Sequence, residues 1–127
     1  MPPLLRPTDA ELAILRVLWE QGPCTVRQVH ETLADTRETG YTTTLKLMQI
    51  MADKGLVTRD ESSRTHVYAP SVNAEHTQGQ LVKDLVDRAF GGSAKALVLR
   101  ALSAEGTTAE ELREIRKLIE DYREKRS

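Results

Sequence analysis

The sequence predicts a mostly α-helical protein with one short β-hairpin. Apolar residues make up 39% of the 127 residues but aromatic residues only 4%, which is typical of helices packed around an aliphatic core. Three segments begin with the Ser/Thr-x-x-Glu/Gln pattern of a capping box, in which two side chains satisfy free N–H groups at a helix start. Two β-rich runs, 56–60 and 65–69, flank a polar turn and predict the hairpin.

The first two helices follow from two of these capping boxes. Thr8 and Glu11 form the first box, and Gly22-Pro23 ends the helix that it starts. Thr25 and Gln28 form the second box. The expected elements are, in order, a helix from Asp9 to about Glu20, an extended segment at 24–26, a helix from Val26 to about Ala34 and a polar turn at 35–40.

The segment from Tyr41 to Val57 predicts the helix around which the rest is organised. It opens with three threonines, whose hydroxyls suit a first turn because they can accept a free backbone N–H. Gly55 provides a left-handed cap after Lys54. We expect one side of this helix to be buried through Leu47, Met48, Ile50 and Met51. The opposite, polar side carries Thr42, Thr43, Lys46 and Gln49, whose polar groups can contact base edges in a major groove.

Three helices followed by a hairpin within about sixty residues are the element order of a winged helix-turn-helix domain with a two-stranded wing. We therefore expect residues 1–70 to form a DNA-binding domain. Arg27 and Arg37 flank the third helix and are candidate phosphate contacts.

Residues 71–127 predict a three-helix dimerisation domain. About fifty helical residues enclose little core by themselves, so their apolar stripes need a partner, most simply a second copy around a two-fold axis. A third capping box, Thr108–Glu111, starts the last helix. The apolar residues expected at the dimer interface are Leu81, Leu85, Phe90, Leu97, Leu112, Ile115, Ile119 and Tyr122.

Composition and motif content limit the functions that this protein can have. The net charge is −1, with eight Lys/Arg against nine Asp/Glu in residues 1–70, so DNA affinity requires a local basic patch. The sequence contains no nucleophile motif, phosphate-binding loop or metal-ligand spacing, which argues against an enzyme and predicts no cofactor and no metal. A lone cysteine, Cys24, fits the reducing cytoplasm. The first nine residues lack the apolar stretch of a signal peptide, and no apolar run is long enough to span a membrane.

The ordered motifs resemble the penicillinase-repressor family, with its BlaI, MecI and CopY branches, over almost the whole chain. The motifs that carry the resemblance are Leu12-Ala-Ile-Leu-Arg-Val-Leu-Trp19, Cys24-Thr-Val-Arg-Gln-Val-His30, Gly40-Tyr-Thr-Thr-Thr-Leu45, Lys54-Gly-Leu-Val57, His66-Val-Tyr68, Phe90-Gly-Gly92 and Ala96-Leu-Val-Leu99. The resemblance implies an N-terminal winged helix, C-terminal dimerisation and repression at two-fold operators.

The resemblance also implies DNA-binding and cleavage roles for particular residues. Recognition-helix positions fall on Thr42, Thr43, Leu45 and Lys46, and wing contacts to phosphate on Ser63 and Arg64. The family often has Arg where Gln49-Ile50 stand here. In several members a membrane-bound sensor protease triggers cleavage of the repressor, and the matching place is Arg100-Ala101, although the local sequence differs from the cleaved members. The metal-responsive branch ends in a cysteine cluster, which this chain lacks.

The sequence thus predicts a homodimeric, cytoplasmic repressor that recognises palindromic double-stranded operator DNA through the major groove and does not insert into a membrane. A winged-helix protein–protein interaction module that binds no DNA is the alternative, because the net charge is close to zero.

Overall fold

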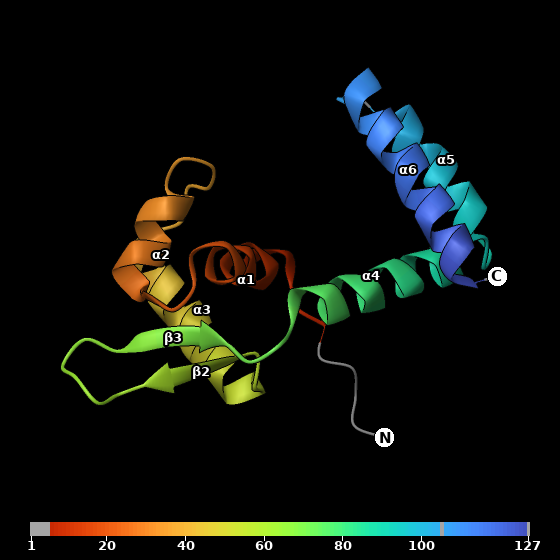
Figure 1. Ribbon diagram of the computed structural model, residues 1–127. Coiled ribbons are helices and arrows are strands. Elements are labelled where there is room, and N and C mark those ends of the chain that lie inside the picture. The colour runs from red at the N-terminus through yellow and green to blue at the C-terminus, as the bar shows by residue number, and fades with distance from the viewer. Residues whose placement is uncertain (1–5, 105, 127) are drawn as a thin grey trace. The chain divides into compact units, whose positions relative to one another are not determined.

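The computed structural model describes residues 6–104 and 106–126, and within them it confirms a mostly helical winged-helix architecture (Figure 1). Residues 1–5, part of the segment in which no signal peptide is expected, lie outside the described ranges. The helices are α1 Asp9–Gln21, α2 Val26–Leu33, α3 Tyr41–Lys54, α4 Ala74–Ala89, α5 Ala94–Ser103 and α6 Ala109–Arg126. The strands are β1 Cys24–Thr25, β2 Val57–Asp60 and β3 Val67–Pro70.

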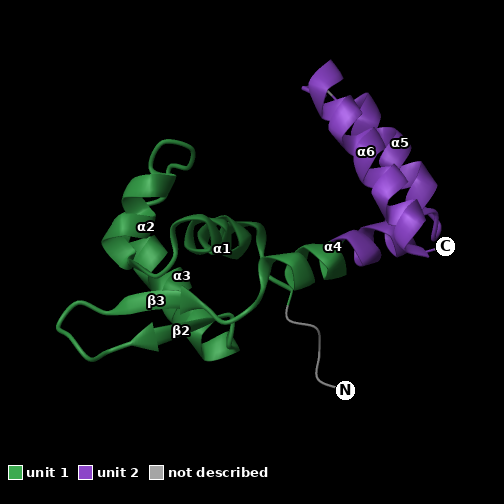
Figure 2. Ribbon diagram, in the orientation of Figure 1, with its two compact units in different colours: residues 1–81 green, residues 82–127 purple. Residues whose placement is uncertain are grey.

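The chain divides into two compact units, residues 1–81 and residues 82–127 (Figure 2). The first unit contains α1 to α3, the sheet and the start of α4. The second contains the end of α4 with α5 and α6. The functional boundary at residue 70 stays a prediction.

The two predicted capping boxes of the first unit are confirmed. At the start of α1, the Glu11 N–H donates to Thr8 Oγ1 at 3.2 Å and the Thr8 N–H donates to Glu11 Oε1 at 2.9 Å. At the start of α2, the same reciprocal pair joins Thr25 and Gln28, at 3.2 and 2.8 Å. Short-range sequence chemistry therefore determines where both helices begin.

Helix α3 begins differently from the prediction. Its N-cap is Gly40, and no side chain accepts a first-turn N–H there. The expected capping role of the threonines is wrong, because Thr44 turns its hydroxyl back to donate to the Gly40 carbonyl at 3.2 Å. Thr44 is buried, whereas Thr42 and Thr43 are exposed. The end of α3 matches the prediction, with Gly55 in the left-handed region at φ 84°.

The predicted hairpin is confirmed and gains a third strand. β2 and β3 pair antiparallel with Arg59 opposite Tyr68, and β1 pairs with the other edge of β3 with Cys24 opposite Tyr68. The strand order is therefore β1-β3-β2. The sequence predicts residues 24–26 as extended but does not reveal their strand partner. This pairing brings the start of α2 beside the hairpin.

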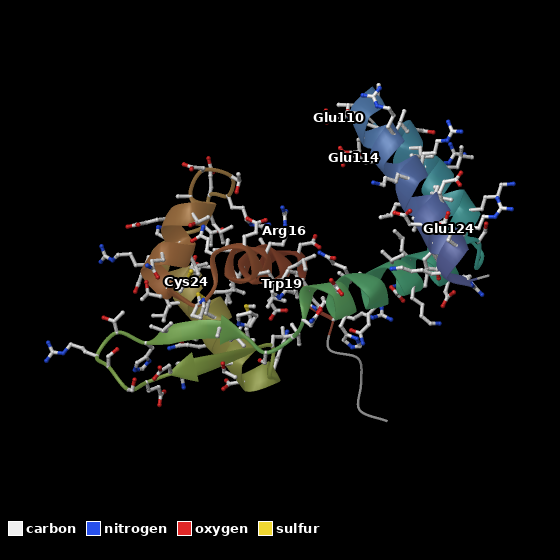
Figure 3. All side chains as sticks on the ribbon, viewed as in Figure 1. Arg16, Trp19, Cys24, Glu110, Glu114 and Glu124 are labelled. Carbon is white, nitrogen blue, oxygen red and sulfur yellow. The ribbon has the colours of Figure 1, made fainter. Side chains whose placement is uncertain are left out.

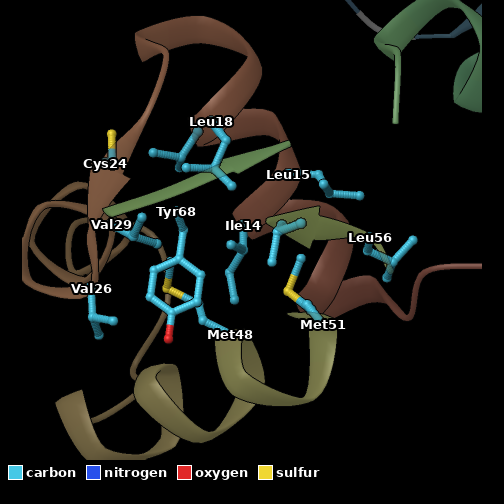
Figure 4. Close-up of a cluster of buried hydrophobic side chains, with 12 residues drawn as sticks. Ile14, Leu15, Leu18, Cys24, Val26, Val29, Met48, Met51, Leu56 and Tyr68 are labelled. Carbon is cyan, nitrogen blue, oxygen red and sulfur yellow. The ribbon is translucent and has the colours of Figure 1, made fainter. Parts of the chain in front are cut away.

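The core of the first unit lies between α1, α2, α3 and the sheet (Figure 4). Tyr68 is fully buried in it, which shows that the hairpin belongs to the core as well as to the surface. Trp19, labelled in Figure 3, is partly buried against this core, and its indole N–H donates to the Val72 carbonyl at 3.0 Å. The core residues are Ile14, Leu15, Val17, Leu18, Cys24, Val26, Val29, Met48, Met51, Leu56, Val57 and Tyr68.

An ion pair joins the start of α1 to the end of α3. The Lys54 ammonium lies 2.9 and 3.1 Å from the two carboxylate oxygens of Glu11, whose side chain is only 1% exposed. Burial by itself raises the pKa of Glu11, but the Thr8 backbone N–H and Lys54 hold that pKa below its ordinary value of 4.5. The ionised carboxylate thus fixes the C-terminal end of α3.

Replacing Glu11 by Gln should lower the free energy of unfolding by about 1–2 kcal/mol at pH 7, because the Lys54 ammonium loses its anion. The folded-state pKa of Glu11 is depressed, so its contribution is present at neutral pH and is lost as pH falls below about 4.5. Urea unfolding at pH 7 and at pH 3.5 should therefore show a smaller difference between wild type and Glu11→Gln at the lower pH.

The matched control is Glu31→Gln, which removes an exposed carboxylate of α2 and should leave stability within about 0.5 kcal/mol of wild type. Equal effects of the two substitutions, or a Glu11→Gln effect that grows as the pH falls, would contradict this account.

Candidate nucleic-acid interface

Helix α3 presents a polar outer side. Thr44, Met48 and Met51 are buried and lie one helical turn apart, so they define the inner side. Lys46 points away from this stripe and is exposed. Thr42, Thr43 and Gln49 are exposed as well. The four polar side chains predicted on the outer side of α3 are therefore all accessible.

The position of Ile50 differs from the prediction. We expected Ile50 to be buried and Lys46 to project from the opposite side, but Ile50 is 37% exposed and lies one turn after Lys46 on the same side. The partly buried Leu45 and Leu47 pack against the core instead. The outer side of α3 thus carries an accessible aliphatic group beside its lysine.

A groove of 440 Å³ lies between the start of α2, the side of α3 and the hairpin. We call the β2–β3 hairpin the wing and this feature the α3–wing groove. It forms because β1 pairs with β3 and thereby places the α2 N-terminus next to the wing. Its lining residues are Thr25, Val26, Arg27, Tyr41, Leu45, Gln49, Arg64, Thr65, His66 and Tyr68.

The groove brings together only part of the predicted DNA-binding set, namely Arg27, Leu45, Gln49 and Arg64. The other predicted residues lie outside its lining. Thr42, Thr43 and Lys46 lie elsewhere on α3, Arg37 is exposed in the segment between α2 and α3, and Ser63 lies in the wing turn. The Ser63 hydroxyl donates to the Thr65 carbonyl at 2.9 Å, so it also shapes this turn.

The charged side chains that line the α3–wing groove carry only positive charge. Arg27 and Arg64 line it, and no Asp or Glu of the described residues does. Two cations of the first unit outside the groove are neutralised locally: Lys54 pairs with Glu11, and Arg59 pairs with Glu61 at 2.8 Å. The groove is therefore a local basic site within a chain of net charge −1.

Six lining residues are not among the predicted DNA-binding residues: Thr25, Val26, Tyr41, Thr65, His66 and Tyr68. Tyr41 could have been found from helical spacing, because it precedes Leu45 and Gln49 by one and two turns. Its ring meets the His30 ring edge-on, with centroids 5.9 Å apart and planes at 87°. This contact ties the end of α2 to the first residue of α3.

The predicted dimerisation residues are largely accessible on the described chain. Leu85, Leu112, Ile119 and Tyr122 are exposed, with Tyr122 reaching 63%. Leu81, Phe90, Leu97 and Ile115 are partly buried. Among the described residues of the second unit none is fully buried, although α5 and α6 each have a regular capping hydrogen bond, to Ser93 and Thr108. Local chemistry therefore forms these helices, whereas their apolar sides remain uncovered.

The remaining chemistry of the described residues is limited. Cys24 is buried, and burial raises the pKa of its thiol above 9.0, so the thiolate needed for nucleophilic attack is scarce at neutral pH. The described part of the chain holds no group of three or more His, Cys, Asp or Glu residues placed to bind a metal ion. None of its helices has both the length and the apolar character required to cross a bilayer.

Comparison with known proteins agrees with this architecture. The penicillinase repressor family pattern matches residues 7–121. The transcriptional regulator BlaI of Mycobacterium tuberculosis is 35% identical over 108 residues, which cover 84% of this chain and 78% of that protein.

Two solved structures share the fold of the first unit. The DNA-binding domain of the repressor BlaI superposes with a TM-score of 0.51 at 23% identity, covering 58% of this chain and 90% of that one. Bacillus licheniformis BlaI, in its monomeric form in complex with the blaP half-operator, superposes with a TM-score of 0.50 at 23% identity, covering 59% and 92%. With the family match over residues 7–121, the chain belongs to the penicillinase repressor family of transcriptional regulators, with an N-terminal winged-helix domain.

Proposed function

We propose that this protein is a transcriptional repressor that acts in the cytoplasm as a homodimer on two-fold operator DNA. The observation that carries the proposal is the α3–wing groove, where Arg27 and Arg64 converge without a carboxylate among the described lining residues. It lies beside the exposed polar side of α3. The complex of Bacillus licheniformis BlaI with a half-operator supports the same use of this fold.

The outer side of α3 suits base contacts. The N-terminal half of a recognition helix enters the major groove in helix-turn-helix proteins. Thr42, Thr43 and Lys46 are exposed in this half of α3. A lysine ammonium can donate to guanine O6 and N7, and threonine hydroxyls can donate or accept at several base edges. Lys46 is the side chain to which we assign the largest share of direct contact.

The α3–wing groove suits the sugar–phosphate backbone. Arginine binds phosphate through paired N–H donors, and phosphate contacts set the position of a protein on the duplex. Arg27 approaches from α2 and Arg64 from the wing, so both sides of the groove carry a donor. Leu45 and Gln49 form the α3 wall between them.

Dimerisation is the second part of the proposal. The second unit leaves Val98, Leu99, Leu118 and Ile119 exposed by 42–69%. Large exposed apolar patches are rare on monomeric proteins and mark surfaces of association. A second copy would cover these side chains and would align two α3 helices with the symmetry of a palindromic operator. Two linked domains also bind more tightly than one, which compensates for the small number of contacts per domain.

Release by proteolysis is a further prediction. The Arg100–Ala101 bond lies inside α5, which continues to Ser103. Both residues are exposed, but a helical bond is a poor protease substrate until the segment opens locally. We propose that a membrane sensor protease system would act here through unwinding of the last turn of α5.

The alternative, a protein–protein module without DNA binding, would use an apolar docking surface. In the described part of the first unit, the large apolar side chains counted as exposed are Tyr41 and Ile50, both on α3. Two separated groups do not make an apolar patch of the size that protein partners use. Mobility-shift titration with random-sequence duplex at 50 mM salt distinguishes the two functions, because a module without DNA binding would retain no duplex even there.

Replacing Lys46 by Ala should weaken operator binding by about 1–3 kcal/mol and relax the base preference at one position of each half-site, if Lys46 contacts a base. If Lys46 contacts only phosphate, the loss should be independent of sequence and the salt slope shallower by about 1 per lost contact. Mobility-shift titrations over a salt series, with an operator selected from random duplex and with single-base variants of it, separate these outcomes.

Lys95→Ala is the control, since it removes an exposed lysine of α5 in the second unit. It should leave both the affinity and the salt slope unchanged. An unchanged affinity and an unchanged slope for Lys46→Ala would refute contact between Lys46 and DNA.

Replacing Ile119 by Asp should convert the dimer to monomers in sedimentation velocity and abolish operator binding at nanomolar protein. The side chain is 58% exposed on the described chain, so the carboxylate harms the fold of the protomer little. In a closed interface, an unpaired buried charge costs about 3–5 kcal/mol.

Lys117→Asp is the matched control, because it places a carboxylate on the same helix two residues earlier, on the opposite side of α6. It should remain dimeric. Dimers of unchanged stability for Ile119→Asp would show that another surface associates.

A further inference from the structure

We propose that His66 is a proton-dependent phosphate contact, so that this protein binds DNA more tightly as the imidazole becomes charged. The inference rests on the proposed DNA binding and assigns the groove a third cation. It makes operator affinity depend on pH in the range between about 6 and 8, where histidine changes its charge.

His66 lies in the α3–wing groove beside the two arginines. His66 directly precedes β3 and lines the α3–wing groove together with Arg27 and Arg64. Tyr68, two residues later, also lines the groove and is part of the core. His66 itself is exposed.

The charged side chains around His66 come from three elements. Arg27 of α2 and Arg64 of the wing line the groove with His66, and the Tyr41 side chain of α3 lines it as well. On β2 and the wing turn the carboxylates are already engaged. Asp60 accepts the Ser62 N–H at 2.9 Å and also interacts electrostatically with His66, and Glu61 pairs with Arg59.

A duplex backbone in the groove would place a phosphate beside His66. A phosphate held by two arginines adds negative charge next to the imidazole, and this charge favours the charged form of the imidazole. Binding would then take up a proton. The extra affinity is therefore expected at the acidic end of the pH range in which histidine changes its charge and is lost toward the alkaline end.

The experiment is a pair of salt-series titrations, at pH 6.0 and pH 8.0, of the full-length protein with a fluorescent duplex that the wild-type protein selected from random DNA. Wild type should bind roughly 5- to 30-fold more tightly at pH 6.0. Its salt slope should be steeper there by about 0.9 per protomer, because each charged imidazole displaces counterions from one phosphate.

Two substitutions at the same position sharpen the test. His66→Gln keeps a polar side chain and should bind like wild type at pH 8.0, but it should gain no affinity and no slope at pH 6.0. His66→Lys carries a permanent charge and should bind at pH 8.0 as tightly as wild type does at pH 6.0. Circular dichroism at both pH values checks that each variant is folded.

His76→Gln and His30→Gln are the controls. His76 is exposed on α4, and His30 contacts Tyr41 at the end of α2, but neither lines the groove. Both should retain the pH dependence of wild type. A pH dependence that survives His66→Gln, that disappears with His76→Gln or His30→Gln, or that is absent from wild type overturns the assignment. Failure of wild type to retain duplex at either pH, even at 50 mM salt, would instead refute the proposed function itself.

Discussion

The packing of one side of α3 against the core decides which side chains this protein offers to a ligand. Thr44, Met48 and Met51 are buried, so the helix cannot rotate without exposing them. The Glu11–Lys54 pair fixes its far end, and the His30–Tyr41 ring contact supports its beginning. Lys46 and the neighbouring threonines are held outward by these constraints. A recognition surface built on a rigid helix keeps its geometry when DNA arrives, which limits the entropy lost on binding.

The sheet brings together the basic residues of the α3–wing groove, which α3 alone does not provide. Because β1 pairs with β3, the wing lies next to the start of α2, and arginines that are 37 residues apart in the sequence line one groove. This arrangement explains how a chain of net charge −1 can bind a polyanion. The cations of the groove face no carboxylate among its described lining residues, whereas Lys54 and Arg59 are used within the fold. The apolar sides of α5 and α6 are exposed to water in a single chain. Covering them with a second chain would stabilise both chains through the hydrophobic effect.

Much of the fold could be predicted because it depends on short-range chemistry. The capping boxes at Thr8 and Thr25 and the left-handed Gly55 mark helix ends through contacts within a few residues. The α3–wing groove could not be predicted, since it depends on a strand pairing between residues more than forty positions apart. Helical spacing alone places Ile50 on the buried side, which is wrong. Neighbouring lengthwise rows of side chains on this helix have similar apolar content, and only tertiary packing decides which row is buried. The threonines of α3 were misassigned as caps because Gly40 takes that position.

The central claim is that DNA contacts the outer side of α3 and the α3–wing groove together. The most direct test is a titration of ¹⁵N-labelled protein with a selected operator duplex, monitored by amide chemical shifts. We predict the largest changes at residues 41–46 and 63–66, with changes also around Arg27. Shifts confined to the exposed side of α1 or to residues 82–127, with α3 and the wing unperturbed, would contradict the account.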